Sequence, residues 1–424
     1  MLYQFYEFNR ALWSPAVALA EAGANIYARE PYKRWPGASE LAAGLGLVHR
    51  VGKDYEKPEF GIRQVQTRGH RMPIVELETD VSPFCRLLRF KRYSDDAKAA
   101  ADLKNDPKVL VVAPLSGHHA TLLRDTVRTL LAEHKVWITD WTDARMVPLD
   151  AGAFRLDDYI ALIRRWIALL GAHDLHVICV CQPSVPVLAA ISLMAAAGET
   201  LPQSLTLMGG PIDTRRSPTK VNDLATTKPL SWFENRVIHR VPRNYPGAGR
   251  MVYPSFLQHS GFVAMNPSRH FRSHRDYYAD LLRGDLEDAE AHRRFYDEYN
   301  AVADLPAEYY LDTIRVVFQE HLLPRGGWDV GGVRVDPGLI REMGLLTIEG
   351  ELDDISGLGQ TEAAHGLTTG LAAADKRHIT VSGAGHYGIF SGRRWREGVY
   401  PDVRDFIAAN ARRKRKPAKA ARAR

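Results

Sequence analysis

The residues with the clearest chemical potential begin with one cysteine at a predicted turn. Cys181 follows the apolar run 175–180 (LHVICV) and precedes Gln182-Pro183-Ser184 and an Ala-rich segment, which predicts a strand, a tight turn and a helix. A turn of this kind exposes one reactive side chain, and free N–H groups at the helix N-terminus favour a thiolate. Cys181 is therefore the candidate nucleophile.

Two further side chains supply what a thiol nucleophile needs, a base and a carboxylate that orients the base. Asp353 follows the apolar run 345–349 (LLTIE), and His386 follows the run 378–381 (HITV). Parallel strands place such residues at one edge of a sheet. The sequence predicts a triad of Cys181, Asp353 and His386, with Asp354 and Asp213 as alternative acids.

The turn departs from the usual pattern in which glycines lie two positions on either side of the nucleophile. Its flanking residues are Cys179 and Pro183. Cys179 is small, and proline suits the first turn of a helix because its missing N–H needs no partner there. We interpret Cys179, and also Cys85, as buried packing residues.

The oxyanion formed by attack on a carbonyl needs hydrogen-bond donors beside the nucleophile. We expect the backbone N–H of Gln182 to be one donor, and the backbone N–H of Leu115 or Ser116 to be the other, because those residues follow the first apolar strand. We predict no metal site. His118-His119 lacks a further ligand at zinc spacing, and Gly209-Gly210-Pro211 is too short for a phosphate loop.

The elements that carry these residues alternate between short apolar runs and helical patterns, which is typical of an α/β protein with a mostly parallel sheet. The expected strands are 109–113, 136–139, 175–180, 205–209, 345–349 and 378–381, with helices at about 121–133 and 156–170. Residues 85–93 predict an antiparallel strand leading into the sheet. The uncharged stretch 175–198 has Gln182 and two prolines at its middle, so we predict a buried strand, turn and helix there rather than a membrane span.

We divide the chain into an N-terminal extension (1–100), a first core part (101–213), an inserted lid (214–335), a second core part (336–410) and a basic tail (411–424). Positions 230–320 hold 15 of the 39 aromatic residues, as expected of a lid over a site at the strand ends. A second helical core is the alternative. The N-terminus predicts an amphipathic helix rich in aromatic residues.

Composition supports a globular protein, since 45% of the 424 residues are hydrophobic and 25% are charged, which excludes collagen-like, wholly disordered and membrane-bundle proteins. Three cysteines are too few for a disulfide framework and favour a reducing cytoplasm. The net charge is +6, of which the tail contributes eight positive charges, so the remainder carries 6 − 8 = −2. The tail is either a solvated terminus or an attachment site for an anionic partner.

The chain resembles the intracellular polyhydroxyalkanoate depolymerases of the poly(3-hydroxybutyrate) type. The resemblance covers nearly everything before the tail and rests on these segments: MLYQFYEFNRALWSPA, APLSGHHATLLRDTV, VCQPSVPVLAA, GGPIDTRRSPT, EGELDDISGLGQT and GAGHYGIFSGRRW. It implies an α/β-hydrolase fold with an aromatic-rich helical lid, no cofactor, and a cysteine, aspartate and histidine at Cys181, Asp353 and His386. The related polymer synthases have glycines on both sides of their cysteine, which this chain lacks.

The resemblance implies hydrolysis of stored poly(3-hydroxybutyrate) in the cytoplasm, at the surface of intracellular granules. Contact with that surface is expected from the lid or from the aromatic side chains near the N-terminus, which are Tyr3, Phe5, Tyr6, Phe8 and Trp13. Three alternatives remain. They are a small-molecule esterase or acyltransferase, including one that transfers the acyl group to coenzyme A, a non-catalytic granule-binding protein, and a nucleic-acid binder that uses the tail.

Overall fold

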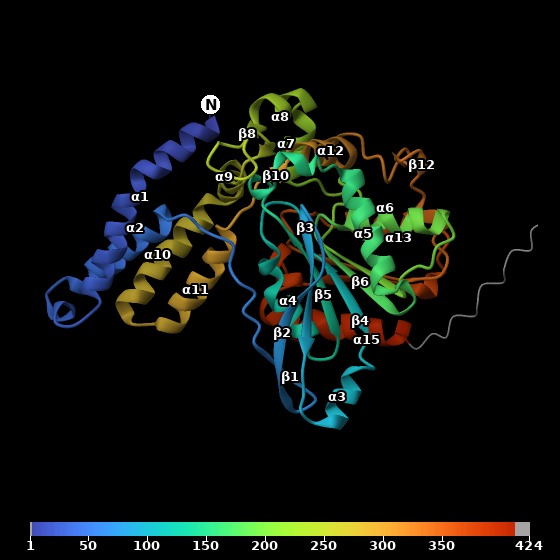
Figure 1. Cartoon of the computed structure of the whole chain (residues 1–424), viewed down its shortest axis with the longest axis horizontal. Coiled ribbons are helices and arrows are strands. Elements are labelled where there is room, and N and C mark those ends of the chain that lie inside the picture. Colours follow the sequence, from blue (N-terminus) through green and yellow to red (C-terminus); the bar gives the residue numbers. More distant parts are fainter. Residues whose placement is uncertain (1, 412–424) are drawn as a thin grey trace, which may run out of the picture.

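A nine-stranded sheet forms the centre of the computed structural model, which describes residues 2–411 (Figure 1). The strand order is β1-β2-β3-β5-β4-β6-β7-β13-β14. The strands are β1 Gln64–Thr67, β2 His70–Ser82, β3 Cys85–Arg92, β4 Lys108–Val112, β5 Lys135–Trp141, β6 Leu175–Val180, β7 Ser204–Met208, β13 Gly344–Gly350 and β14 Lys376–Val381. From β5 to β14 all neighbours are parallel, whereas β1, β2 and β3 pair antiparallel. This is the α/β-hydrolase architecture that the sequence predicts.

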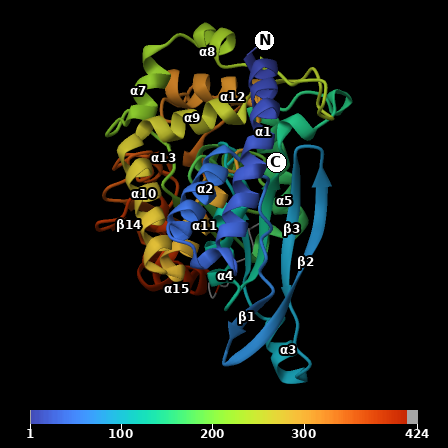
Figure 2. The same cartoon turned by 90° about the vertical axis from the view of Figure 1, so that its left-hand side faces the viewer.

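The central strands are apolar on both faces because helices cover both sides of the sheet. All residues of β6 and β7 are buried. Helices α5 (Leu156–Leu170) and α6 (Ser184–Ala196) pack together on one face, and α4 (Arg124–Leu130) and α15 (Tyr400–Ala411) lie on the other (Figures 1 and 2). The buried residues of α5 follow the single stripe expected from its spacing.

The predicted helix at 121–133 is shorter than expected. A 3₁₀ turn, Ala120–Leu123, leads into α4, which ends at Leu130. Residues 131–134 form turns because the chain must reverse before β5 begins at Lys135.

The N-terminal region forms a hairpin of two helices, α1 (Leu2–Tyr27) and α2 (Ala38–Gly52), which lie side by side outside the sheet (Figure 2). Helix α2 packs on α10 of the insertion. Helix α3 (Ala97–Leu103) and the long strands β2 and β3 complete the region. The predicted antiparallel strand at 85–93 is confirmed as β3.

The insertion between β7 and β13 is largely helical. Its elements are α7 Lys220–Thr227, α8 Leu230–Arg236, β8 His239–Arg240, β9 Met251–Tyr253, α9 Ser255–Met265, α10 Pro267–Arg283, α11 Leu286–Tyr299, β10 Leu305–Pro306, α12 Ala307–Thr313, β11 Asp329–Val330 and β12 Val333–Arg334. Two short helices, α13 Ala364–Leu367 and α14 Gly392–Arg394, follow in the second core part. Helices α7, α8, α9 and α12 gather beyond one end of the sheet (Figure 1).

The predicted five-part division of the chain stays a prediction. Among residues 2–411, every helix is too short or too polar to span a bilayer. The uncharged stretch 175–198 forms β6, a turn and α6, as predicted. Of the basic tail, residues 412–424 lie outside the described residues.

Candidate active site

Cys181 occupies a strained turn between β6 and α6. Its φ angle is +68°, in the left-handed region that residues other than glycine rarely adopt. The Cys181 N–H donates to the Met208 carbonyl oxygen at 2.7 Å, which ties the turn to the end of β7. The side chain is half-buried and lines a cavity. Backbone strain at a half-buried thiol that lines a cavity resembles the geometry of a nucleophile elbow.

Close backbone approach at this turn depends on Gly209 and Gly210, which are too few to form a phosphate loop but leave room for the elbow. A Cβ atom at Gly210 would lie 2.9 Å from the Cys181 carbonyl oxygen and would overlap Ser184. A Cβ atom at Gly209 would lie 3.1 Å from the His386 ring. The close-approach glycines therefore lie directly after β7, the strand next to the elbow, rather than two positions on either side of the cysteine.

His386 and Asp353 form a buried pair beside the turn. His386 Nδ1 lies 2.7 Å from Asp353 Oδ2. The other carboxylate oxygen, Oδ1, accepts hydrogen bonds from the N–H groups of Ile355 and Ser356, both at 2.9 Å. The backbone thus fixes Asp353 so that one oxygen remains for the imidazole.

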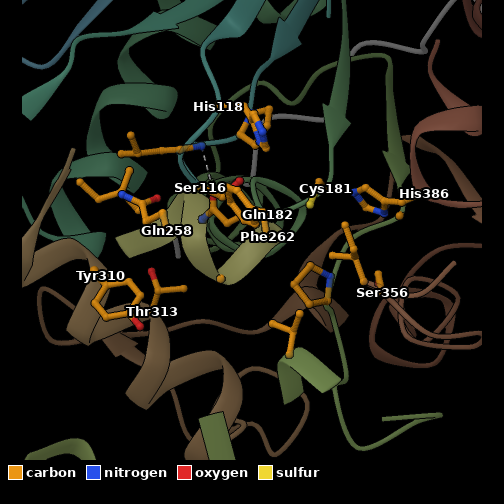
Figure 3. Close-up of a pocket in the computed structure, with 18 of the residues that line it drawn as sticks. Ser116, His118, Cys181, Gln182, Gln258, Phe262, Tyr310, Thr313, Ser356 and His386 are labelled. Atoms are coloured by element: carbon orange, nitrogen blue, oxygen red, sulfur yellow. Dashed lines mark hydrogen bonds between the residues drawn. The ribbon is translucent and has the colours of Figure 1, made fainter. Parts of the chain in front are cut away.

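Burial alone would lower the pKa of His386, but the nearby Cys181 and Asp353 outweigh it and raise this pKa well above its usual value. Figure 3 shows the Cys181 and His386 side chains next to each other on one wall of the cavity. The structure therefore brings together the three residues proposed as the triad, and their catalytic role stays a proposal.

The two alternative acids lie elsewhere. Asp354 Oδ2 accepts a hydrogen bond from the Asn266 side chain at 2.9 Å. Asp213 pairs with the Arg215 guanidinium at 2.8 Å. Neither carboxylate contacts His386, so the geometry favours Asp353.

The predicted oxyanion donors lie on two loops that meet near Cys181. The backbone N–H of Leu115 donates to the side-chain Oε1 of Gln182 at 3.3 Å. Gln182, Leu115 and Ser116 all line the cavity. Their role as oxyanion donors stays a prediction, and the Leu115 N–H is bonded to the Gln182 side chain.

The cavity beside Cys181 has a volume of about 310 Å³ and a mostly apolar lining. The insertion contributes many of its walls, including Phe233, Phe262, Tyr309, Tyr310 and Phe318. The core contributes Cys181, Gln182 and His386 from the strand ends (Figure 3). The aromatic insertion therefore covers the site.

The histidines at 118 and 119, which the sequence analysis rejects as a zinc site, are both buried, with 8% of each exposed. His118 stacks on Phe262 at a ring distance of 4.7 Å and its Nε2 lies 3.1 Å from the Tyr299 carbonyl oxygen. His118 thus packs against the insertion in the cavity wall, whereas His119 is buried but does not line the cavity. Among residues 2–411, no group of three or more acidic, His or Cys side chains is arranged to hold a metal ion.

Sequence reasoning missed Tyr309 and the side chain of Gln182. Tyr309 lies on α12 in the insertion and lines the cavity. No spacing or motif marks it, because only the folded insertion brings it to Cys181. Cys85 and Cys179 are fully buried, as their interpretation as packing residues expects.

One family model matches a segment in the second half of the chain. Residues 209–411 match the family model described as PHB (poly(3-hydroxybutyrate)) de-polymerase C-terminus. The matched segment begins at Gly209 and includes Asp353 and His386, whereas Cys181 precedes it. No curated protein matches the chain.

Solved structures are also similar to the chain, at low identity. A carboxylesterase of the thaumarchaeon Nitrososphaera gargenis is 10% identical, with a TM-score of 0.41 over 80% of this chain and 98% of its own. A 2-hydroxy-6-oxo-6-phenylhexa-2,4-dienoate hydrolase of Rhodococcus is 11% identical, with a TM-score of 0.43. The match covers 80% of this chain and 99% of the hydrolase. A monoacylglycerol lipase of Paleococcus ferrophilus is 14% identical, with a TM-score of 0.41. The match covers 72% of this chain and 94% of the lipase.

Proposed function

The chain is an α/β-hydrolase similar to the poly(3-hydroxybutyrate) depolymerases, and from this premise we propose that it cleaves polyhydroxyalkanoate ester bonds with Cys181 as nucleophile. One observation carries the proposal. A strained, half-buried thiol lies at an apolar cavity beside an imidazole that is bonded to a fixed carboxylate. This arrangement has the parts of a nucleophile, a general base and an orienting acid.

In the first half of the reaction, His386 takes the Cys181 proton while Asp353 stabilises the imidazolium. The thiolate sulfur bonds to the ester carbonyl carbon, and the carbonyl oxygen becomes an oxyanion. As the tetrahedral intermediate collapses, the bond from carbon to the alcohol oxygen breaks and His386 protonates that oxygen. The shortened polymer leaves, and a 3-hydroxybutyryl thioester remains on Cys181.

In the second half, His386 takes a proton from water, and the hydroxide oxygen bonds to the thioester carbon. The carbon–sulfur bond then breaks, and His386 returns the proton to the sulfur. The products are free Cys181 and a 3-hydroxy acid. Coenzyme A could replace water at this step, because a thiol also attacks a thioester, and the product would then be an acyl-coenzyme A.

The cavity supports an uncharged polyester as substrate. Its walls are mainly aromatic and aliphatic, with only a few polar side chains, which is the lining that a neutral acyl chain prefers. Its volume of about 310 Å³ has room for more than the scissile group. A short uncharged polymer segment therefore suits the apolar part of this lining, which also includes Lys220.

A polymer in a granule must meet the enzyme at a surface, and α1 offers an apolar one. Phe5, Phe8, Leu12 and Leu19 recur on one side of α1, and each is more than 60% exposed. The opposite side holds Tyr3, which is buried against the insertion through its hydrogen bond to Asp304. An amphipathic helix with its apolar side turned outward suits contact with a hydrophobic surface.

Location on cytoplasmic granules is part of the same proposal. The basic tail is proposed as a second contact, with an anionic partner, because it carries eight positive charges and no acid. Most of it lies outside the described residues. The proposal for the site does not depend on it.

The test is incubation of the purified protein with amorphous poly(3-hydroxybutyrate), with and without coenzyme A, followed by product identification. We expect release of 3-hydroxy acid, or of its coenzyme A thioester, by the wild type and none by Cys181→Ala. Cys85→Ala is the matched control because it removes a buried thiol of β3, outside the cavity. Activity retained in Cys181→Ala would refute the proposal.

The alternatives give different results in the same assay. A small-molecule esterase would hydrolyse short soluble esters through Cys181 without attacking the polymer. A non-catalytic granule-binding protein would bind the polymer with no product from either substrate.

A further inference from the structure

One lysine lies at the mouth of the cavity beside Cys181. Of the described residues that line this cavity, Lys220 is the one lysine, and none is an arginine, aspartate or glutamate. Lys220 is exposed although it lines the cavity, so it lies where the cavity opens to solvent. Leu224, one turn further along α7, is 52% exposed and also lines the cavity. Helix α7 therefore forms part of the rim, and Lys220 is its charged member.

The ammonium of Lys220 has donors to spare. Within the described chain its Nζ donates one hydrogen bond, to the Met265 carbonyl oxygen at 3.4 Å, and it forms no ion pair. A hydrogen bond of this length is weak, and an ammonium carries three N–H donors. Met265 is the last residue of α9 and also lines the cavity. The ammonium thus lies between α7 and α9 at the rim, with donors available to an anion.

The start of α7 is fixed to the loop that carries Asp353. The Thr219 N–H donates to the Asn222 side-chain oxygen at 2.7 Å, which caps the helix. The Thr219 hydroxyl donates to the Ile355 carbonyl oxygen at 3.0 Å, and the Ile355 N–H donates to Asp353 Oδ1 at 2.9 Å. A short chain of hydrogen bonds therefore holds the backbone of Lys220 in place relative to the triad acid.

An ammonium at the rim of an otherwise apolar cavity suits a substrate that is apolar along its length and negative at one end. A linear polyester of 3-hydroxy acids has a hydroxyl at one end and, at the other, a carboxylate that is ionised at pH 7. When an ester bond is cut, the acyl part that joins Cys181 holds the hydroxyl end, and the alcohol that leaves holds the carboxylate end. In a short oligomer this carboxylate is close enough to the cut bond to reach the rim.

We propose that Lys220 binds the free carboxylate of short 3-hydroxy acid oligomers, so that the enzyme prefers them to neutral esters of the same length. This role rests on the proposed ester hydrolysis and gives the same site a further class of substrate. Because the carboxylate belongs to the leaving fragment, Lys220 favours the attack by Cys181, and its contact is lost when the alcohol departs. Lys220 is thus a specificity-determining residue of the first half of the reaction only.

The test compares two soluble substrates, with identification of the products. One is the linear trimer of 3-hydroxybutyrate, and the other is the same trimer with a carboxamide in place of the terminal carboxylate. The carboxamide has nearly the same shape and no charge. We expect the wild type to have a kcat/KM for the acid trimer about fivefold above that for the amide trimer, the upper range for an exposed ion pair. This preference should shrink between about 0.02 M and about 0.5 M NaCl, because salt screens the pair.

Lys220→Met removes the charge and keeps an unbranched side chain. It should lower kcat/KM for the acid trimer about fivefold and leave kcat/KM for the amide trimer unchanged. Lys220→Arg should restore most of the preference. Deacylation of the 3-hydroxybutyryl enzyme, followed in the burst kinetics of a p-nitrophenyl ester, should proceed at the wild-type rate in Lys220→Met. A merely structural lysine would instead affect both trimers alike.

Lys228→Met is the matched control. Lys228 is an exposed lysine at the other end of α7 and does not line the cavity. Its replacement removes one positive charge from the same helix. We expect this variant to keep the wild-type preference for the acid trimer.

The outcomes separate the two proposals. Equal kcat/KM for the two trimers in the wild type, or a preference that survives Lys220→Met, would overturn the role of Lys220 and leave ester hydrolysis intact. So would a wild type that degrades amorphous polymer but neither trimer. A Lys220→Met variant that keeps the preference but has a raised KM for coenzyme A would assign the lysine to the phosphate groups of that thiol instead. Trimer hydrolysis undiminished in Cys181→Ala would refute the proposed function, and the role of Lys220 with it.

Discussion

Gly210→Ala is the change whose effect follows most directly from the shape of the elbow. A Cβ atom at this position would lie 2.9 Å from the Cys181 carbonyl oxygen and would overlap the Ser184 side chain. Gly210 cannot easily move away, because its N–H and its carbonyl oxygen are both bonded to the Thr361 hydroxyl, at 2.8 and 2.9 Å. The strained turn at Cys181 must therefore move instead.

The expected cost has two parts. Overpacking of this kind lowers the free energy of unfolding by about 1–3 kcal/mol. Displacement of the Cys181 sulfur by about 1 Å lowers kcat/KM for a soluble ester on the order of 100-fold, since catalysis depends on near-attack geometry. At a temperature where the variant remains folded, the fraction of unfolded protein is too small to explain a 100-fold loss of activity. The loss of activity should thus come from the displaced sulfur.

The assay is ester hydrolysis together with denaturant unfolding, and Gly44→Ala is the control. Gly44 lies within α2, and a Cβ atom there would meet nothing within 4 Å. We expect this control to keep wild-type activity and to gain about 0.5–1 kcal/mol of stability, since alanine is the better helix residue. A Gly210→Ala variant with wild-type activity would refute the reasoning about the elbow.

Three further predictions concern the triad, the N-terminal helix and a buried acid pair. Asp353→Asn should lower kcat on the order of 10⁴-fold, because an amide facing His386 Nδ1 favours the wrong imidazole tautomer; steady-state kinetics on the soluble ester measure this. Phe8→Ser with Trp13→Ser should lower activity on amorphous polymer and leave activity on a soluble ester unchanged. Burial, and then Asp304, raise the pKa of Asp143 to about 7. The free energy of unfolding, measured in urea, should therefore fall as pH rises from 5 to 8. This fall should be smaller in Asp304→Asn.

The sign of the last effect follows from proton binding. In the unfolded chain Asp143 loses its proton above its ordinary pKa of 3.8, whereas in the folded protein it keeps the proton up to a pKa of about 7. The extra proton stabilises the folded state, and this stabilisation is lost as pH rises through the folded pKa. The ion pair between Arg145 and Asp143 offsets part of the charge, since one guanidinium faces two carboxylates. A free energy of unfolding that rises over this range would contradict the assignment.

The helix prediction has its own control in Leu169→Ser, which changes an exposed leucine of α5, away from α1 (Figure 1). This variant should keep full activity on polymer. Equal loss in both proteins would mean that general surface apolarity, rather than α1, governs the contact. For Asp353→Asn, a kcat close to that of the wild type would contradict the role of the aspartate.

The sequence predicts the strand-end positions of Cys181, Asp353 and His386 because each follows an apolar run, and parallel strands end at one edge. The choice of Asp353 over Asp354 could not come from this pattern. It depends on backbone N–H groups of Ile355 and Ser356, which orient one carboxylate toward the imidazole. Such donors leave no trace in residue type.

Two other features could not be predicted because they depend on distant segments meeting. Gly210 lies beside Ser184 only when β7 pairs with β6. Tyr309 reaches the cavity wall only when the insertion folds over the sheet. The amphipathic pattern of α1 predicts a helix, but a usual amphipathic helix turns its apolar side inward, whereas here Phe8 and its neighbours face outward.

The most direct test of the account is to trap the acyl-enzyme. A rapid quench of the wild type with a 3-hydroxybutyryl ester, followed by intact-protein and peptide mass measurement, should find one 3-hydroxybutyryl group on the peptide that carries Cys181. The label should be located on the cysteine sulfur, and Cys181→Ala should carry none. An acyl group on Ser184 instead, or turnover without any Cys181 adduct in the wild type and undiminished in Cys181→Ala, would contradict the account.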